Sequence, residues 1–363
     1  MKNIPQLEKI RKQINRIDKD ILELLHQRIN LAKKVKVIKS STHSSYYQPS
    51  REKEIFDLIL KENKDIFPEK SLSAIFTEIF SASRKIQSEL KIGYFGAQAS
   101  FTHIAAIKLF GHESIYIPHA TLRDIFVEVE NDCIDFGVVP IENSNEGVVP
   151  YTMDLFMEFD HQIINEIYLP VEQNLVSLEK DINRIKILYA HFQSLGQCRT
   201  FIRNNLPSAK IIEKSSTSQA AREAARKKMT AALSSKLAAQ IYKLNVLAES
   251  VQDNLYNYTR FLVIAKKPIK LKNNIKYKTS IVCGIKDRPG ELFKLIKPFN
   301  DFKINMTKIE SRPTRRKAWE YMFFIDFIGK ATDKKVKPAI SRIKKSTTYF
   351  KILGSYPAAK GVK

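Results

Sequence analysis

The sequence predicts a protein of three structural units: an all-α part, then an α/β part, then a small α+β part of the ferredoxin-like type. Three observations support this fold class. A chain of 363 residues is too long for a single hydrophobic core. Apolar residues recur with helical periodicity up to about residue 90, whereas strand-like and helix-like segments alternate from Lys91 onward. A linker rich in Lys and Asn follows Pro268 and precedes the last unit.

Residues 5–39 are predicted to form one long helix. Apolar residues recur there at spacings of three and four, as in the seam of a coiled coil. These residues are Leu7, Ile10, Ile14, Ile17, Ile21, Leu24, Leu31, Val35 and Ile38. Arg28 occupies the one missing seam position, and a guanidinium there is costly unless an anion pairs with it. Both a structural ion pair with a partner helix and an anionic ligand fit this pattern.

Two other basic residues are placed by helical geometry. Lys39 lies eleven residues after Arg28, and eleven steps of 100° return to within about 20° of the same face. Arg11 lies on a different face, so it cannot easily serve the same site within one helix, but it could serve the site of a second subunit. A second helix is predicted at residues 50–61.

A third helix is predicted to start at Pro68 and to end near Leu90. Ser83 and Gln87 are four residues apart and share one face of this helix. Residues 5–90 resemble the all-helical chorismate mutase domain, which is an intertwined dimer of long helices. The matching positions are Arg11, Arg28, Lys39, Arg51, Glu52, Ser83 and Gln87. Some family members carry Asp where Gln48 stands here.

The resemblance implies chorismate as the substrate and a pericyclic rearrangement, which needs no nucleophile and no cofactor. The residues implied to bind the substrate are Arg28, Arg51, Ser83 and, from the second subunit, Arg11. Lys39 and Gln87 would stabilise the negative charge that develops on the breaking ether oxygen. Glu52 would hold the ring hydroxyl.

In the α/β part, polar residues gather at the ends of predicted strands. Glu142, Asn143 and Ser144 follow a strand at 136–141, where they either line a ligand crevice or form an ordinary capped turn. His191 stands among turn and cap residues, either as a hydrogen-bonded helix-start histidine or as a catalytic one. The hydroxyl-rich segment Ser215, Ser216 and Thr217 precedes an Ala-rich helix; it either binds a carboxylate or only caps the helix.

The apolar run at 261–265 reads as a buried strand that begins with Thr259 and Arg260. A turn entering a strand would explain these two residues, as would an anion site at the sheet edge. Together with the preceding segments and with Gly93 and Gly96 at the start of this part, they resemble prephenate dehydratase, a two-lobed α/β protein, across residues 91–267. The loop at 96–99 departs from the family, which usually has Pro and Gly there.

This second resemblance implies prephenate as the substrate, which loses water and carbon dioxide to become phenylpyruvate without a cofactor. Thr259 would hydrogen-bond or protonate the leaving hydroxyl, with help from a neighbouring group or water. Arg260 would either pair with a carboxylate of the substrate or brace the site. The other implied substrate-binding residues are Glu142, Asn143, Ser144, His191, Ser215, Ser216 and Thr217.

The last unit, at about 275–357, is predicted as a ββαββαβ arrangement or a close relative. Two of its segments resemble the phenylalanine-binding motifs of the ACT domain: Gly290, Leu292, Glu310, Ser311, Arg312 and Pro313. The alternative is a structural appendage without a ligand. Family members commonly have Ala where Glu291 stands here, and the added negative charge predicts weakened feedback by phenylalanine.

Composition favours a globular, cytoplasmic protein, with 44% hydrophobic and 27% charged residues. We expect no membrane association, because there is neither a signal-peptide core nor an apolar run of about 20 residues. The scattered Cys133, Cys198 and Cys283 predict reduced thiols and no metal. The net charge of +23 is spread along the chain without a nucleic-acid-binding motif, so we expect anionic small molecules as partners and no nucleic acid.

Taken together, the resemblances predict a bifunctional chorismate mutase and prephenate dehydratase with a regulatory domain. The expected domains span residues 1–90, 91–267 and 275–357. We expect a homodimer or a higher homo-oligomer. The alternative class is a binding protein that keeps the fold and the amino-acid sensor without catalysis, but the seven mutase positions argue against it.

Overall fold

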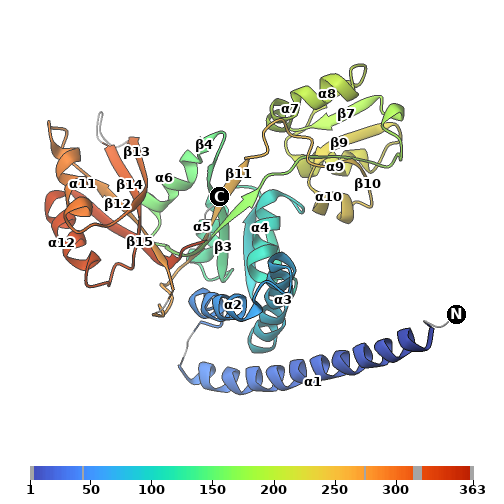
Figure 1. The fold of residues 1–363 in the computed structure, drawn as a ribbon. Helices are drawn as coiled ribbons and strands as arrows, with labels where there is room; N and C mark the ends of the chain where they lie inside the picture. Colours follow the sequence, from blue (N-terminus) through green and yellow to red (C-terminus); the bar gives the residue numbers. More distant parts are fainter. Residues whose placement is uncertain (1–3, 43–44, 274, 314–320, 360–363) are drawn as a thin grey trace.

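The computed structural model describes residues 4–42, 45–273, 275–313 and 321–359 (Figure 1). The first unit, here called the helical domain, has the three predicted helices: α1 (Ile4–Thr42), α2 (Pro49–Asn63) and α3 (Glu69–Gln87). The third helix ends at Gln87 and not near Leu90, because Ser88 already has an extended backbone. Leu90 is instead buried beside the first strand of the next unit.

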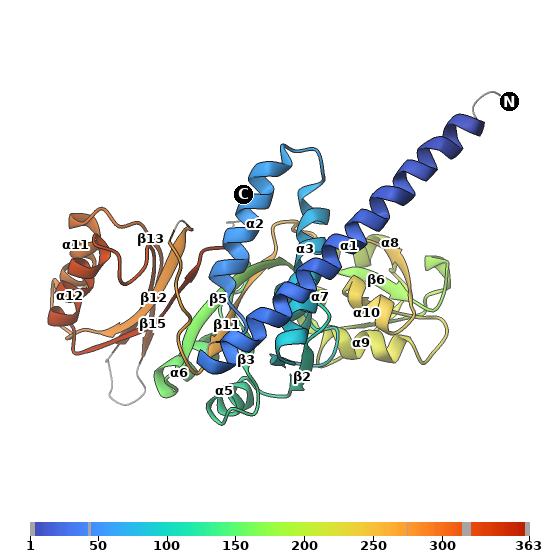
Figure 2. The ribbon, with the colours of Figure 1, turned by 90° about the horizontal axis from the view of Figure 1, so that it is seen from below.

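Helix α1 is a long arm whose N-terminal half lies away from the rest of the described chain (Figures 1 and 2). Its apolar seam faces solvent, with exposed fractions of 50% for Ile14, 57% for Ile17 and 62% for Leu24. Only its C-terminal half packs on α3, where Ala32 is buried. Since a long apolar stripe on a soluble domain normally faces a partner, this seam is unsatisfied in a single chain.

The middle unit, the two-lobed domain, consists of two sheets with helices. The first lobe has the strand order β2-β1-β3-β11-β5, with β4 paired to β3. Its elements are β1 (Lys91–Phe95), α4 (Phe101–Phe110), β2 (Ile115–His119), α5 (Leu122–Glu130), β3 (Phe136–Asn143), β4 (Gly147–Val148), α6 (Pro150–Glu158), β5 (Gln162–Pro170) and β11 (Tyr258–Ala265). The apolar run of β11 is buried throughout, since this strand lies between β3 and β5.

The second lobe is an excursion of the chain between β5 and β11, and it rises beside the first lobe (Figure 1). Its sheet has the order β10-β6-β9-β7-β8. Its strands are β6 (Asn174–Ser177), β7 (Ile187–Ala190), β8 (Lys210–Glu213), β9 (Thr230–Ser234) and β10 (Asn245–Ala248). Its helices are the short 3-10 helix Ile182–Arg184, α7 (Phe192–Gln197), α8 (Arg199–Asn205), α9 (Thr217–Ala224) and α10 (Lys236–Ile241).

The C-terminal domain has a βαββαβ order, so the expected extra strand before its first helix is absent from the described residues. Its elements are β12 (Tyr277–Gly284), α11 (Glu291–Asp301), β13 (Met306–Pro313), β14 (Tyr321–Ile328), α12 (Val336–Ser346) and β15 (Tyr349–Pro357). The sheet order is β13-β14-β12-β15. The sequence also predicts a strand from Trp319 to Phe327; its first two residues lie outside the described residues, and β14 contains the rest.

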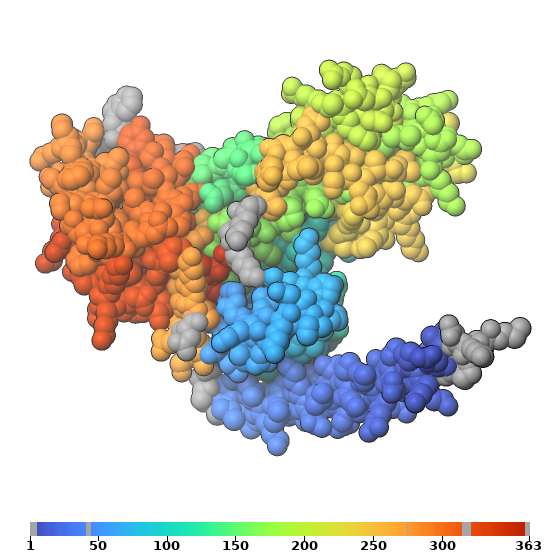
Figure 3. Space-filling view, in the orientation of Figure 1, coloured from blue at the N-terminus to red at the C-terminus, as the bar shows by residue number. Residues whose placement is uncertain are grey.

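Both faces of this last sheet are covered. On β12, Ile281 and Cys283 pack among residues of α11 and α12, whereas Val282 joins a cluster with Met153 and Phe156 of α6. The alternation of period two therefore sends every second side chain into the first lobe. At Gly354 of β15 the backbone of the first lobe is so close that an added Cβ would lie 2.1 Å from the carbonyl oxygen of Ile163. The space-filling view shows the C-terminal domain and second lobe on either side of the first lobe (Figure 3).

Candidate active sites

The helical domain contains a cavity of about 500 Å³ between its three helices. Six of the seven mutase-like residues line it: Arg28, Lys39, Arg51, Glu52, Ser83 and Gln87. The seventh, Arg11, is exposed on the projecting half of α1 and does not line the cavity. Tyr46, Arg84 and Lys272 also line it, and none of these three was predicted from the sequence.

Arg28 spans the gap between α1 and α3. Its Nη1 donates to the Ser83 hydroxyl and to the carbonyl oxygen of Ile79, the latter at 3.3 Å, and its guanidinium lies 5.4 Å from the ring centre of Phe80. Burial lowers the pKa of Arg28, and the nearby Glu52 carboxylate partly opposes this shift. The guanidinium of Arg28, which interrupts the apolar seam, is thus bound by hydrogen-bond acceptors of α3 and lies at the wall of the cavity.

Glu52 is the carboxylate of this cavity. Burial is the largest influence on it and raises its pKa, while Arg84, Lys39 and Arg28 favour its ionised form. Lys39 donates to the backbone oxygens of Ser45 and Tyr46 at 3.1 and 3.3 Å. Burial also lowers the pKa of Lys39, against the attraction of Glu52. A carboxylate set among several cations suits a dianionic ligand that also carries a hydroxyl group.

Arg84 was missed because no local signal marks it: the residue acquires its surroundings only when α3 packs on α2 and on the first lobe. One nitrogen of its guanidinium binds the Glu52 carboxylate, and another donates to the carbonyl oxygen of Phe110 at 2.6 Å. The guanidinium also lies 5.4 Å from the ring centre of Tyr47. Lys272 comes from the linker after the two-lobed domain, which periodicity could not place at all.

In the two-lobed domain, the cross-strand register of β3 and β11 pairs Asn143 with Thr259. The Asn143 amide nitrogen donates to the Thr259 hydroxyl at 2.9 Å and to the Asn257 side-chain oxygen at 2.8 Å. Ser144 is tied to the same segment, because its hydroxyl donates to the Tyr256 carbonyl oxygen at 2.8 Å and accepts from the Tyr258 amide at 2.9 Å. The structure therefore brings together three of the predicted residues from segments more than 100 positions apart.

The remaining predicted residues of this site lie on the second lobe. His191 follows β7, and Ser215 to Thr217 follow β8, its parallel neighbour, so both segments lie at the same edge of the sheet. Ser216 is the N-cap of α9, as its hydroxyl accepts from the Gln219 amide at 3.1 Å. Burial lowers the pKa of His191, which favours the neutral ring.

A cavity of about 460 Å³ opens between the two lobes. Asn145 and Glu146 contribute from the turn after β3, and Phe192 and Gln193 contribute from the start of α7. Ser144 and His191 are the direct sequence neighbours of Asn145 and Phe192, but neither of them lines this cavity, and Thr259 does not line it either. Such a crevice between lobes is a common place for a small-molecule site.

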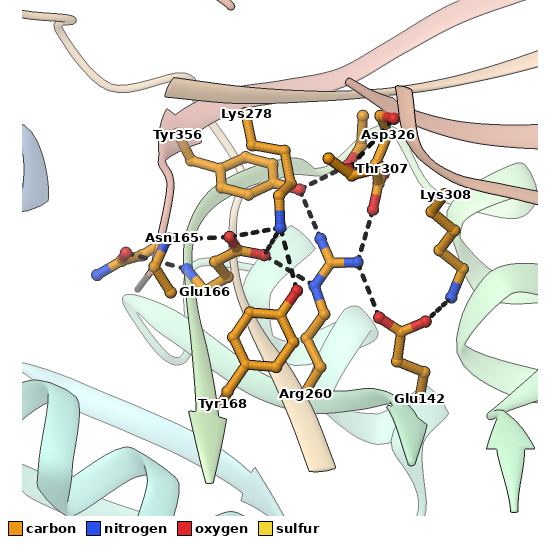
Figure 4. Close-up of polar contacts among 12 residues, drawn as sticks. Glu142, Asn165, Glu166, Tyr168, Arg260, Lys278, Thr307, Lys308, Asp326 and Tyr356 are labelled. Carbon is orange, nitrogen blue, oxygen red and sulfur yellow. Dashed lines mark hydrogen bonds and ion pairs between the residues drawn. The ribbon is translucent and has the colours of Figure 1, made fainter. Parts of the chain in front are cut away.

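Arg260 and Glu142 form ion pairs within the protein (Figure 4). Arg260 is 3% exposed. It binds Glu166 at 2.8 Å through Nε, Asp326 at 2.6 Å and Glu142 at 3.2 Å through Nη1, and the Tyr356 hydroxyl at 2.9 Å through Nη2. These four hydrogen bonds use four of the five guanidinium N–H groups, which favours the bracing alternative.

Six charged side chains form this network, which joins the first lobe to the C-terminal domain. Three are cations and three are carboxylates, so their formal charges cancel: Arg260, Lys278 and Lys308 against Glu142, Glu166 and Asp326. Burial, the largest influence, would raise the pKa of Glu142 and of Asp326. The neighbouring cations outweigh it and lower both.

The phenylalanine-motif residues are divided between two places in the C-terminal domain. Gly290 begins α11 with φ of +84°, and Leu292 on its first turn is 44% exposed. The motif 310–313 lies on β13, where burial alternates, so that Glu310 and Arg312 are more buried than Ser311 and Pro313. Arg312 binds both carboxylate oxygens of Asp154 on α6, at 3.1 and 3.3 Å. The Glu291 carboxylate binds Lys294 at 2.7 Å, and this hydrogen bond lowers its pKa.

The described ranges contain no group of three or more His, Cys, Asp or Glu side chains placed to hold a metal ion. Likewise, none of the helices within them has the length and apolarity needed to cross a membrane.

The fold and the cavities define a class of protein with two separate small-molecule sites, one helical and one between α/β lobes, followed by an ACT-like domain. The family descriptions match in this order: chorismate mutase type II at residues 10–88, prephenate dehydratase at 92–269 and the ACT domain at 279–345. The chain belongs to the family of bifunctional chorismate mutase/prephenate dehydratases.

Similar proteins cover nearly the whole chain. The bifunctional chorismate mutase/prephenate dehydratase of Aquifex aeolicus is 44% identical over 98% of this chain and 98% of its own. The protein of the same name from Stutzerimonas stutzeri is 35% identical over 99% of this chain and 100% of its own. The prephenate dehydratase of Arthrobacter aurescens, solved in complex with L-Phe, is 30% identical with a TM-score of 0.68, covering 75% of this chain and 93% of that one.

Proposed function

We propose that this chain converts chorismate to prephenate in the helical domain and prephenate to phenylpyruvate between the lobes of the middle domain. The observation that carries the first step is the cavity in which Arg28, Lys39 and Glu52 meet. Arg28 and Arg51 bind the carboxylates of the substrate, Ser83 orients one of them, and Lys39 and Gln87 stabilise the ether oxygen as its bond to carbon breaks. Glu52 accepts a hydrogen bond from the ring hydroxyl.

For the second step, Thr259 is the proposed donor to the leaving hydroxyl. Its oxygen already accepts a hydrogen bond from Asn143, so its own proton is free to point toward a substrate. Protonation lets the ring hydroxyl leave as water while the C–C bond to the carboxylate breaks and releases carbon dioxide. The bonding electrons of that C–C bond complete the aromatic ring. Asn143, Ser144, His191 and the segment 215–217 bind the remaining polar groups.

We further propose a cytoplasmic homodimer formed through α1. The exposed apolar seam of the arm supports this proposal, because a second copy would cover it. In that dimer Arg11 of each arm completes the site of the other subunit. The proposed domains span 1–90, 91–267 and 275–357.

The experiment is a two-stage assay on the purified chain. Arg28→Ala should abolish the formation of prephenate from chorismate but leave the conversion of supplied prephenate intact. Thr259→Val keeps the side-chain shape and should do the reverse, lowering the dehydratase rate by orders of magnitude. A change of less than threefold, under about 1 kcal/mol of barrier, would exclude a chemical role for Thr259. A natural chain with neither activity would instead indicate a binding protein.

Phenylalanine is the proposed inhibitor, bound at the C-terminal domain near Gly290, Leu292 and residues 310–313. The ion pair of Glu291 with Lys294 reduces the negative charge offered to an amino-acid ligand. Glu291→Ala should therefore tighten inhibition of the dehydratase only modestly. If the inhibition curve of Glu291→Ala coincides with that of the natural chain, Glu291 does not weaken the site.

A further inference from the structure

Arg84 lies where the helical domain meets the first lobe. Its side chain is 5% exposed, and it faces the mutase cavity with one edge and the first lobe with the other. Toward the cavity it forms the ion pair with Glu52. Toward the lobe it donates at 2.6 Å to the carbonyl oxygen of Phe110, the last residue of α4. Its guanidinium is 5.4 Å from the ring centre of Tyr47 and 6.0 Å from that of Phe110.

We propose that Arg84 is a positioning residue for the mutase reaction, which holds the Glu52 carboxylate in place and is itself held by the dehydratase domain. This inference rests on the proposed function of Glu52 as the acceptor for the ring hydroxyl of chorismate. A planar guanidinium can bind two acceptors in fixed directions, so one side chain can transmit the position of the Phe110 carbonyl to Glu52.

The geometry of Glu52 agrees with this role. Arg84 binds Oε1 of Glu52, so the other oxygen, Oε2, is the proposed acceptor for the substrate hydroxyl. The cations Arg28 and Lys39 also attract Glu52. Without Arg84, this attraction would move the Glu52 carboxylate toward the proposed binding positions of the substrate carboxylates. Arg84 also favours the ionised form of this buried group, against a burial effect that raises its pKa.

The surroundings of Arg84 make the contact with the dehydratase domain rigid. Next to Phe110, Gly111 has φ of +70°, and an added Cβ would lie 2.5 Å from the Cβ of Ser81 on α3. The Ser81 hydroxyl accepts from the Glu113 amide at 3.0 Å, and Glu78 accepts from the His112 amide at 3.1 Å. Helix α3 is therefore hydrogen-bonded to the segment after α4 over the two turns that precede Arg84.

The test uses the full chain with Arg84→Met, which keeps an unbranched stem against Tyr47 and removes the charge and the hydrogen bonds. We expect mutase kcat to fall roughly tenfold to a hundredfold, since a misplaced polar group has an effect of this size. Dehydratase activity on supplied prephenate should stay within twofold, which reports that the chain is folded. The acid limb of the mutase pH profile should move to higher pH, because Glu52 loses the cation that favours its ionised form.

Two matched variants separate positioning from packing. Arg84→Lys keeps a cation near Glu52 and should restore part of the pH shift. In a Glu52→Gln background no carboxylate remains to be held. There, Arg84→Met should lower mutase kcat much less and should not shift the acid limb of the mutase pH profile. Equal losses in both backgrounds, or an unmoved pH limb with Arg84→Met, would overturn the inference while leaving the proposed mutase function intact. A natural chain that forms no prephenate would refute both.

Discussion

The two-lobed domain is joined to its two neighbours in different ways. At the joint with the helical domain, Tyr47 inserts into the core of the first lobe, with its ring centre 4.5 Å from that of Phe110 and 5.3 Å from that of Phe136. Its hydroxyl accepts from Asn165 at 2.7 Å. Beside it, Arg84 donates to the carbonyl oxygen of Phe110. Two exposed side-chain pairs also cross this joint, Lys85 with Glu113 and Glu78 with His112. The buried side chains at this joint are thus mainly aromatic, and apart from Arg84 the charged side chains that cross it are exposed.

The joint with the C-terminal domain buries a network of six charges in addition to its apolar contacts. An apolar contact is non-directional and changes gradually with distance. A buried ion-pair network has fixed geometry, and a broken pair leaves an uncompensated charge. We therefore expect the charged joint, and not the aromatic one, to rearrange when a regulatory ligand binds, because switching transitions commonly repack ion pairs at an interface.

The largest effect is expected from Arg260→Met. This change leaves Glu166 and Asp326 in the interior with fewer cations, so we expect a loss of about 3–5 kcal/mol in unfolding free energy. Dehydratase activity should be lost, since Arg260 is adjacent to Thr259, but mutase activity should survive at temperatures below the onset of unfolding. Chemical denaturation measures the unfolding free energy, and separate assays measure the two activities. Arg123→Met, which breaks the exposed pair with Glu158, is the control and should change little.

The aromatic joint can be disturbed from the dehydratase side with Gly111→Ala. The strained backbone alone costs about 1–3 kcal/mol, and the clash with Ser81 should displace α3 from the Phe110 carbonyl. Mutase activity should therefore fall severalfold although the substitution lies outside the helical domain. Gly147→Ala is the matched control, because its φ is +84° and no atom lies within 4 Å of the added Cβ. The idea fails if both variants affect the mutase equally.

A smaller effect is expected from Lys308→Met at the charged joint. Glu142 keeps Arg260 as a partner, so the fold should persist while one link between β13 and the dehydratase site disappears. The phenylalanine concentration for half-inhibition should shift by about fivefold, the low end of common coupling energies. Lys297→Met, which breaks a pair with Asp301 on α11, should leave that concentration unchanged. An unshifted curve for Lys308→Met would show that this ion pair carries no regulation.

The smallest expected effect is a difference in how the unfolding free energy of variants at Asp326 and at Glu52 depends on pH. The folded-state pKa of Asp326 is lowered, so its contribution to stability exists above its unfolded pKa of about 4 and disappears as the pH falls through the folded value. The pKa of Glu52 is raised, so its contribution is present below about pH 4 and is lost as the pH rises through the folded value. Asp326→Asn should thus destabilise at pH 7 more than at pH 3. Glu52→Gln should show the opposite trend in thermal unfolding, and trends of equal sign would contradict the comparison.

Much of this architecture follows from local patterns. The heptad seam predicted α1, the apolar run predicted β11, and the position of Arg28 on the seam predicted a charged site at a helical interface. Each of these depends on residues close together in the chain, where the period of the backbone determines which side chains share a face. The order of the domains follows from the same patterns, because the period changes at Lys91 and after Pro268.

Only the tertiary structure decided the partners of Arg84 and Arg260. Arg260 meets Glu166 across 94 positions and Asp326 across 66, and Arg84 meets Glu52 across 32. No periodicity relates such residues, since their contacts arise from the packing of whole elements. A buried guanidinium must find acceptors wherever packing places them. The sequence alone therefore determined the order and fold class of the domains, while packing between domains decided which charges brace the predicted sites.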